Sequence, residues 1–427
     1  MKRVAIITYG CKINQYESAC ILDDFKSANY EIVPFGNEAD VYIINSCTVT
    51  NRTDYKSRNS LRKALSQKAT NPNVKIIVTG CYSQRNADEI SKLGAIDLIV
   101  DNNKKEQIFQ FLQQGGNCFE NILNATEFAE LSTNSMNDKT RAFVKIQDGC
   151  DYYCAYCAIP FARGHSRSRK RENVLNQVEK LAQNDYQEFV FGGINLGLYR
   201  QENDYSLADL LFDVEKIEGV KIIRLSSIEP QLFTDNLLAY FRKSKKIAPH
   251  FHIPLQVGCD ELLLKMNRKY ITSEFSNQID KIREIFPNVA IGIDVIVGLP
   301  GETDVLFQET LKFLQNLDFT YLHVFSYSKR FGTKAAEMKG QIGGKTMKKR
   351  SNILTELSDK KKQKYIKKIL LQRPILSGIV ESEKDGWQTV LSDHFIRIYL
   401  KNEEHKRHCR FRIIGKIFDG IEVEILR

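Results

Sequence analysis

Hydrophobic residues in the first part of the chain gather in short runs separated by longer amphipathic stretches. Four of these runs, rich in β-branched residues, lie at residues 4–8, 41–45, 75–79 and 97–100. Helical stretches such as residues 15–27 and 54–68 lie between them. Short apolar runs alternating with helices predict a parallel sheet covered by helices. We assign this unit to residues 1–113.

The same alternation returns after a polar connector, roughly residues 117–139. Six apolar runs are predicted as strands: 142–146, 189–191, 222–225, 251–255, 290–297 and 321–325. Helical stretches separate them: 172–183, 206–217, 235–243, 273–285 and 304–317. Six βα repeats predict an open, incomplete relative of the (β/α) barrel, with sites at the carboxyl ends of its strands. We place this core at residues 136–365.

The tail has a different pattern, with short strands separated by turns. These strands are predicted at residues 375–381, 387–391, 395–400, 411–414 and 422–426. Apolar and polar residues alternate with period two in residues 421–425, as expected of a half-buried strand. The tail, residues 367–427, is therefore predicted to form a small β-barrel. The expected fold class is α/β in the first two domains, followed by this barrel.

Composition adds a location for the positive charge. The 427 residues carry a formal net charge of +10, and residues 339–368 hold eleven Lys or Arg against two acidic residues. Such a segment is either a solvated helix face or a surface that attracts a phosphate backbone. A second group follows position 162, and we interpret it as a phosphate contact or a solvated surface: Arg163, Arg167, Arg169, Lys170 and Arg171.

Two observations bear on where the protein works. No run of 18 or more apolar residues occurs, so we expect no membrane span. Ten cysteines without a secretory segment indicate a reducing compartment, where clustered cysteines bind metal or catalyse. We therefore expect a cytoplasmic protein.

Three cysteines in one short stretch, Cys150, Cys154 and Cys157, follow the first strand of the predicted barrel. A loop with C-x3-C-x2-C spacing can direct three thiolates at one metal centre. Structural zinc sites are usually closed by four ligands. Three local ligands therefore fit a 4Fe-4S cluster with one open iron better. The alternative is a zinc site completed by a distant residue such as His165.

This spacing resembles the radical S-adenosylmethionine (SAM) enzymes. The resemblance implies a cluster whose open iron binds the amino and carboxylate groups of SAM. It also implies candidate SAM contacts near the strand ends: Tyr156, Gly192, Gly193, Asn195, Ser226, Glu229 and Arg268. The two glycines also fit a plain turn, and Glu229 also fits a helix cap. Arg268 is suited to pair with a carboxylate.

Three further cysteines, Cys11, Cys47 and Cys81, each fall just beyond the end of a predicted strand in the first domain. The carboxyl ends of parallel strands form one edge of a sheet, where α/β proteins place their sites. These cysteines can therefore meet as a second three-thiolate set. The alternative is that each packs as a small hydrophobic residue.

An N-terminal α/β domain with three strand-end cysteines, followed by C-x3-C-x2-C, resembles the methylthiotransferase family. Residues 10–17, Gly-Cys-Lys-Ile-Asn-Gln-Tyr-Glu, are similar to the branch that acts on N6-threonylcarbamoyladenosine. The resemblance implies two 4Fe-4S clusters, the second held by Cys11, Cys47 and Cys81, and a tail that is an RNA-binding TRAM domain.

The activity implied by this resemblance is the addition of a methylthio group to C2 of N6-threonylcarbamoyladenosine at position 37 of tRNA. It implies SAM, the anticodon loop of tRNA and an electron donor protein as partners. Two alternatives remain open. One is a sister methylthiotransferase that acts on N6-isopentenyladenosine or on a ribosomal protein. The other is a non-catalytic, zinc-containing RNA-binding protein.

Overall fold

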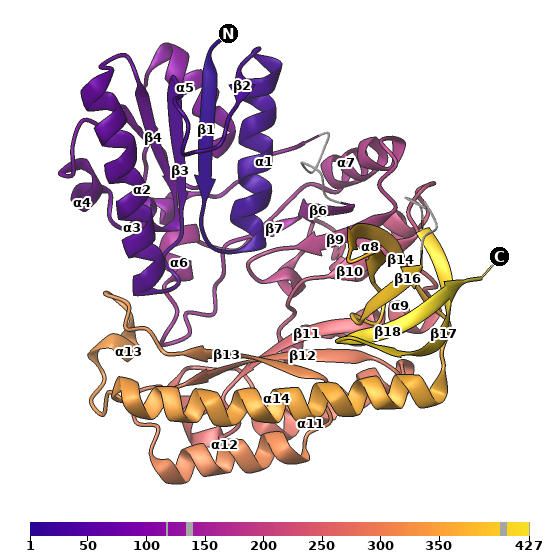
Figure 1. The fold of residues 1–427 in the computed structure, drawn as a ribbon. Helices are drawn as coiled ribbons and strands as arrows, with labels where there is room; N and C mark the ends of the chain where they lie inside the picture. The colour runs from indigo at the N-terminus through magenta and orange to yellow at the C-terminus, as the bar shows by residue number, and fades with distance from the viewer. Residues whose placement is uncertain (117, 134–139, 402–407, 427) are drawn as a thin grey trace.

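Three lobes make up the computed structural model, which describes residues 1–116, 118–133, 140–401 and 408–426 (Figure 1). Part of the polar connector and the predicted start of the core at residue 136 lie outside the described residues. The mixed α/β fold class with a terminal β-barrel is confirmed.

The first lobe is a five-stranded parallel sheet in the order β2-β1-β3-β4-β5. Its strands are β1 (Arg3–Thr8), β2 (Glu31–Ile32), β3 (Val41–Ser46), β4 (Lys75–Gly80) and β5 (Leu98–Ile99). Its helices are α1 (Lys12–Ser27), α2 (Asn51–Thr70), α3 (Cys81–Arg85), α4 (Ala87–Ser91), the 3-10 turn η1 (Lys105–Gln107) and α5 (Ile108–Gln114). The four predicted strands are present, and the short β2 adds an edge that the sequence did not indicate.

The second lobe is the predicted partial barrel. Its six strands are β6 (Arg141–Lys145), β9 (Glu188–Gly192), β10 (Ile222–Leu225), β11 (His250–Gln256), β12 (Ala290–Val297) and β13 (Tyr321–Ser326). They form two parallel three-stranded sheets, joined by a bridge between Ile223 and Ile247. The spatial order of the strands therefore follows the chain.

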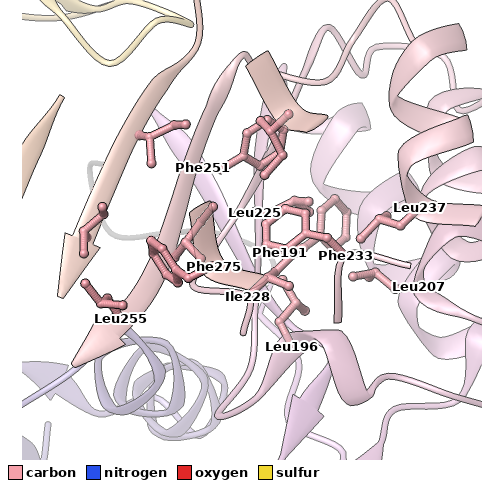
Figure 2. Packing of buried hydrophobic residues seen from close by; sticks show 14 of the residues in the cluster. Phe191, Leu196, Leu207, Leu225, Ile228, Phe233, Leu237, Phe251, Leu255 and Phe275 are labelled. Carbon is pink, nitrogen blue, oxygen red and sulfur yellow. The ribbon is translucent and has the colours of Figure 1, made fainter. Parts of the chain in front are cut away.

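Helices cover the outside of this barrel. They are α7 (Arg171–Gln183), α8 (Leu207–Glu215), α9 (Asp235–Lys243), α11 (Thr272–Ile285) and α12 (Asp304–Asn316). Phe191, Leu225 and Phe251 from the strands are buried against Leu207 and Leu237 from the helices (Figure 2). Burial of each large apolar side chain contributes about 1.5–3 kcal/mol. This packing holds the strand ends, and hence the loops beyond them, in fixed positions.

A long helix leads to the tail. Helix α14 (Gly344–Gln372) has 29 residues and packs along β12 and β13 (Figure 1). It is about 43 Å long at 1.5 Å per residue. The tail strands then close a barrel in the order β14-β15-β16-β18-β17. They are β14 (Leu376–Lys384), β15 (Trp387–Leu391), β16 (Arg397–Lys401), β17 (His408–Ile417) and β18 (Gly420–Ile425).

The tail barrel docks on the amino-terminal end of the partial barrel. The ring of Phe395 stacks on that of His250, the first residue of β11, with centroids 3.9 Å apart. Arg224 on β10 donates hydrogen bonds to the backbone carbonyls of Ser392 (2.7 Å) and Asp393 (3.2 Å). The opposite end of the barrel, at the carboxyl ends of its strands, faces the first lobe. No helix among the described residues has the length and apolar character needed to cross a membrane.

Candidate active site

The loop that carries Cys150, Cys154 and Cys157 follows β6 and the short strand β7 (Gln147–Asp148), and it ends at helix α6 (Ile159–Arg163). Backbone hydrogen bonds hold its shape: Cys150 N–H donates to the Gly164 carbonyl (3.0 Å), and Ala155 N–H donates to that of Met266 (2.9 Å). Burial, together with the nearby thiols of Cys154 and Cys150, raises the pKa of Cys157 to about 12. The three sulfurs are therefore neighbours in a low-dielectric setting.

Two of the candidate SAM contacts reach these sulfurs directly. The amide Nδ2 of Asn195 lies 3.6 Å from Sγ of Cys150, and Nη1 of Arg268 lies 3.3 Å from Sγ of Cys154. Hydrogen bonds to the sulfurs of an iron–sulfur cluster tune its reduction potential. Both side chains therefore fit the surroundings of a cluster.

Arg268 also links the loop to Glu229. Its guanidinium pairs with the Glu229 carboxylate and lies 3.3 Å from the hydroxyl of Tyr156. Burial raises the pKa of Glu229, and the positive charge of Arg268 opposes that rise. Glu229 precedes the short 3-10 helix η4 (Pro230–Leu232), but its side chain makes no cap hydrogen bond. The helix-cap interpretation is therefore wrong, whereas the carboxylate pairing of Arg268 is present.

Two buried polar atoms at this edge have no hydrogen-bond partner among the described residues: Oδ1 of Asn195 and Oγ of Ser226. Such atoms are costly to bury unless a ligand satisfies them. They lie beyond the carboxyl ends of β9 and β10, where a polar ligand such as SAM fits. Direct contact between SAM and these residues stays a prediction.

Gly192 and Gly193 allow β9 to end close to the cysteine loop. A Cβ on Gly192 would lie 2.1 Å from the Phe143 ring, and one on Gly193 would lie 2.7 Å from Oε1 of Gln147. Close packing therefore requires glycine at both positions. It does not by itself show that either residue contacts a ligand.

The second trio lies on the first lobe, at the edge that faces the barrel. Cys11 precedes α1, Cys47 follows β3, and Cys81 begins α3 directly after β4. Burial and the nearby thiols of Cys81 and Cys11 raise the pKa of Cys47 to about 12. A Cβ on Gly10 would lie only 2.5 Å from Sγ of Cys47. The three strand-end cysteines therefore share one edge of the first lobe, and their role as a ligand set stays a prediction.

Neither cysteine trio is grouped closely enough to form a ready-made site for a single metal ion. In the part of the chain that the structure describes, no three His, Cys, Asp or Glu side chains are grouped so that they could hold a metal ion. His165, the proposed fourth zinc ligand, is exposed, and its Nδ1 lies 2.8 Å from Oδ1 of Asp151. Cys20, by contrast, packs in the barrel-side core as a buried apolar residue.

A cavity of about 270 Å³ lies between the two cysteine-bearing edges. Thr48, next to Cys47, forms part of its wall, as do Cys157 and Asp294. Arg330 ties this wall together because its Nη1 donates to the Thr48 carbonyl at 3.1 Å and pairs with Asp54 at 2.7 Å. A larger hollow of about 710 Å³ lies between α7 and α8 and touches neither trio.

A chain of three polar side chains inside the barrel leads to this cavity. Ser227 Oγ lies 2.9 Å from Nδ1 of His252, and Nε2 of His252 lies 2.8 Å from Oδ1 of Asp294. None of these three residues was assigned a role from the sequence. A signal was available for Asp294, which is the single charged residue in the otherwise apolar strand β12.

The arginines after the cysteine loop do not form a solvated or phosphate-binding surface as a group. Arg163, Arg167 and Arg169 are buried, with exposed fractions of 0%, 5% and 2%. Arg169 pairs with Glu130 at 2.8 Å. Both sequence interpretations are wrong for these three, because they pack beneath the cysteine loop and at the boundary between lobes.

The basic segment over residues 339–368 forms most of α14. Arg350 is buried and pairs with Glu302 (2.6 Å), and Lys361 donates to the carbonyl of Leu317 at the end of α12 (2.6 Å). Several lysines remain exposed: Lys345, Lys348, Lys349, Lys360, Lys362, Lys364 and Lys367. Part of the charge is therefore structural, and the remainder is a solvated basic face.

Comparison with known proteins agrees with this geometry. Residues 3–101 match the family described as "Uncharacterized protein family UPF0004", and residues 144–314 match the "Radical SAM superfamily". The radical SAM methyltransferase TsrM from Kitasatospora setae has a similar fold, with a TM-score of 0.59 over 79% of this chain and 77% of that protein, at 12% identity. The barrel is thus a radical SAM barrel, which implies a 4Fe-4S cluster and SAM.

Sequence relatives extend over the whole chain. It is 38% identical to the threonylcarbamoyladenosine tRNA methylthiotransferase MtaB of Bacillus subtilis, over 100% of this chain and 94% of the relative. MtaB of Aquifex aeolicus is also 38% identical, over 91% and 98%. The tRNA-2-methylthio-N(6)-dimethylallyladenosine synthase of Natranaerobius thermophilus is 32% identical, over 90% and 88%. The chain belongs to the radical SAM methylthiotransferase family.

Proposed function

We propose that this protein adds a methylthio group to C2 of N6-threonylcarbamoyladenosine beside the anticodon of tRNA. The observation that supports the proposal is a cavity lined both by Cys157 of the barrel loop and by Thr48, the residue after Cys47 of the first lobe. A reaction that joins sulfur to an unreactive carbon needs a radical source and a sulfur donor at one place. Relatives named for this activity match this chain over 94–99% of their own length and support the choice of substrate.

In this proposal Cys150, Cys154 and Cys157 hold the cluster that works with SAM. When bound, the cluster and SAM supply the radical that activates a carbon–hydrogen bond. The chain's own residues hold the centre in place: Asn195 and Arg268 donate to cysteine sulfurs, and Arg268 fixes Glu229. Glu229, Ser226 and the edge of β9 are then positioned to bind polar groups of SAM.

Cys11, Cys47 and Cys81 hold the auxiliary cluster in the same proposal. The two lobes meet at the cavity, where Arg330 of the barrel reaches Thr48 and Asp54 of the first lobe. A target base must enter from single-stranded RNA, whose unstacked bases can turn out of the helix. The anticodon loop meets that requirement.

Two further parts of the proposal concern partners and place. An electron donor protein is required to reduce the cluster before SAM can be cleaved. Because the substrate is tRNA, we place the enzyme in the cytoplasm. The exposed lysines of α14 and the tail barrel are the surfaces that we assign to the RNA backbone.

Nucleoside analysis of tRNA tests the substrate. Cells that lack the protein should lose the methylthio form of threonylcarbamoyladenosine and keep that of isopentenyladenosine. Reintroduction of the wild-type chain should restore the mark, whereas a Cys150→Ala variant should not. Loss of the isopentenyladenosine mark instead would assign the protein to the sister activity, and unchanged tRNA would refute a tRNA substrate.

Metal analysis tests the cofactors separately. After anaerobic purification the wild-type protein should hold about eight iron atoms per chain, the sum of two four-iron clusters. Changing either cysteine trio to alanine should remove about half. Zinc in a colourless preparation would contradict both clusters.

A further inference from the structure

Five charged side chains lie sealed between the first lobe and the barrel. Glu17 on α1 and Lys105 on η1 belong to the first lobe, whereas Lys145 on β6, Asp148 on β7 and Arg163 on α6 belong to the barrel. None is more than 3% exposed. Charged residues are almost never buried so fully unless they are paired. We call this set the interlobe charge cluster.

Arg163 is the centre of the interlobe charge cluster. Its Nη1 pairs with Glu17 and lies 3.2 Å from Oδ2 of Asp148, and its Nη2 donates to Oε2 of Glu17 at 3.1 Å and to Oδ1 of Asn14 at 2.6 Å. Its Nε donates to Sγ of Cys81 at 3.3 Å. All five guanidinium N–H groups therefore have acceptors: four of the bonds reach residues of the first lobe, and the fifth reaches Asp148 of the barrel.

Lysines complete the links across the boundary. Lys145 donates to Oε1 of Glu17 (2.8 Å) and to Oδ2 of Asp148 (2.6 Å), and Lys105 pairs with the other oxygen of Glu17. Glu17 thus receives cations from both lobes. The buried charges of each lobe therefore have their partners on the other lobe as well as on their own.

The charges of the cluster do not cancel. Three cations, Lys105, Lys145 and Arg163, face two carboxylates, which leaves one positive charge in a region closed to water. The sulfur of Cys81 is the further acceptor that Arg163 touches. An anionic sulfur ligand at that position matches the excess charge. Arg163 also lies on α6, which begins just after Cys157 of the other trio.

We propose that Arg163 is a positioning residue. It holds Cys81 of the first lobe close to the barrel loop that carries Cys157, and it sets the reduction potential of the cluster on the first lobe. The inference rests on the auxiliary cluster of the proposed function. A hydrogen bond from a cation to a cluster sulfur stabilises the reduced, more negative state of the cluster. Removal of that donor should therefore make the potential more negative.

The test uses full-length protein in which Cys150, Cys154 and Cys157 are alanine, so that one cluster remains. Arg163→Gln and Arg163→Lys are compared with Arg350→Gln, which breaks an equally buried arginine pair, with Glu302, away from any cysteine. The readouts are iron and sulfide content and a redox titration followed by electron paramagnetic resonance. Arg163→Gln should shift the potential to more negative values and lower the iron content, with Arg163→Lys intermediate. Arg350→Gln should change stability alone.

Each other result overturns the inference in its own way. Equal reduction potentials for Arg163→Gln and Arg350→Gln would show that Arg163 has only a structural role as an ion-pair partner. If iron is retained in that case, the proposed auxiliary cluster still stands. A parent triple-alanine protein that binds no iron would refute the auxiliary cluster itself, and the inference with it. If Arg163→Gln does not fold, the comparison between Arg163→Lys and Arg350→Gln decides.

Discussion

Arg268 donates a hydrogen bond to the sulfur of Cys154 over 3.3 Å. The same guanidinium pairs with Glu229, so one residue fixes both the cysteine loop and a buried carboxylate. An arginine can do this because its planar fork presents several donors at once. A lysine at this position would offer a single nitrogen in place of this planar fork.

Loss of Arg268 should therefore destabilise the protein and impair SAM cleavage together. Arg268→Met leaves the Glu229 carboxylate buried without its cation, and we expect the free energy of unfolding to fall by about 3–5 kcal/mol. Adding Glu229→Gln should recover part of that loss. Anaerobic urea denaturation of the two single variants and the double variant measures the coupling. Strictly additive losses would show that the pair does not interact.

The polar chain in the barrel gives a second prediction. Asp294→Asn removes the carboxylate that holds His252 and changes a wall of the cavity. We expect kcat to fall about 10- to 100-fold, because small displacements near reacting groups are costly. Ser227→Ala is the matched control: it removes the other hydrogen bond of His252 and leaves Asp294 in place. An equal loss in both variants would argue against a special role for Asp294.

Gly80 gives a prediction for the first lobe. Its φ of +99° disfavours other residues, and a Cβ would lie 2.2 Å from the carbonyl oxygen of Ser46. Gly80→Ala should lower the free energy of unfolding by more than about 3 kcal/mol and displace the adjacent Cys81, with loss of iron. Gly36→Ala, on an exposed turn with nothing within 4 Å of its Cβ position, should change stability by less than about 0.5 kcal/mol. Thermal unfolding and iron analysis distinguish the two.

The docking loop of the tail should respond to acid. Burial raises the pKa of Asp393, but hydrogen bonds from His394 and Ser377 outweigh it, so that the pKa of Asp393 is lowered overall. A lowered folded-state pKa stabilises the fold above the unfolded value, near pH 4, and this stabilisation is lost as the pH falls further. Trp387 on β15, the single tryptophan of the chain, reports on the tail.

We therefore expect the midpoint of urea unfolding, followed by Trp387 fluorescence, to move to lower urea concentration below about pH 4. In an Asp393→Asn variant this acid-dependent part of the shift should disappear, although the variant should be less stable at neutral pH. A shift of the same size in both proteins would assign the acid response to other carboxylates.

The strands were predictable because each depends on a local pattern. The apolar run that predicts a strand at residues 290–297 becomes β12 with the same bounds. The two-residue strand β2 is exposed at both positions and has no apolar pattern to reveal it. Its pairing with β1 follows from the fold of the lobe rather than from its own residues.

The interlobe charge cluster could not be read from the sequence. Glu17 and Arg163 are 146 positions apart, and each is of a residue type that usually lies at the protein surface. Burial of such groups becomes favourable only when partners from two domains arrive together. The crowded arginines after Cys157 were interpreted as exposed for this reason. Cysteine positions were easier, since their relation to strand ends is itself local.

The contact between Phe395 and His250 has a consequence for how RNA would be held. A terminal module on a loose tether samples many orientations, whereas this one is stacked on β11, bonded to Arg224 and joined through a continuous helix. The separation between the tail surface and the cavity is therefore constant from one molecule to the next. If the tail binds RNA as proposed, a loop held there would lie at a set distance from the reaction centre, and the framework would select which nucleotide is presented.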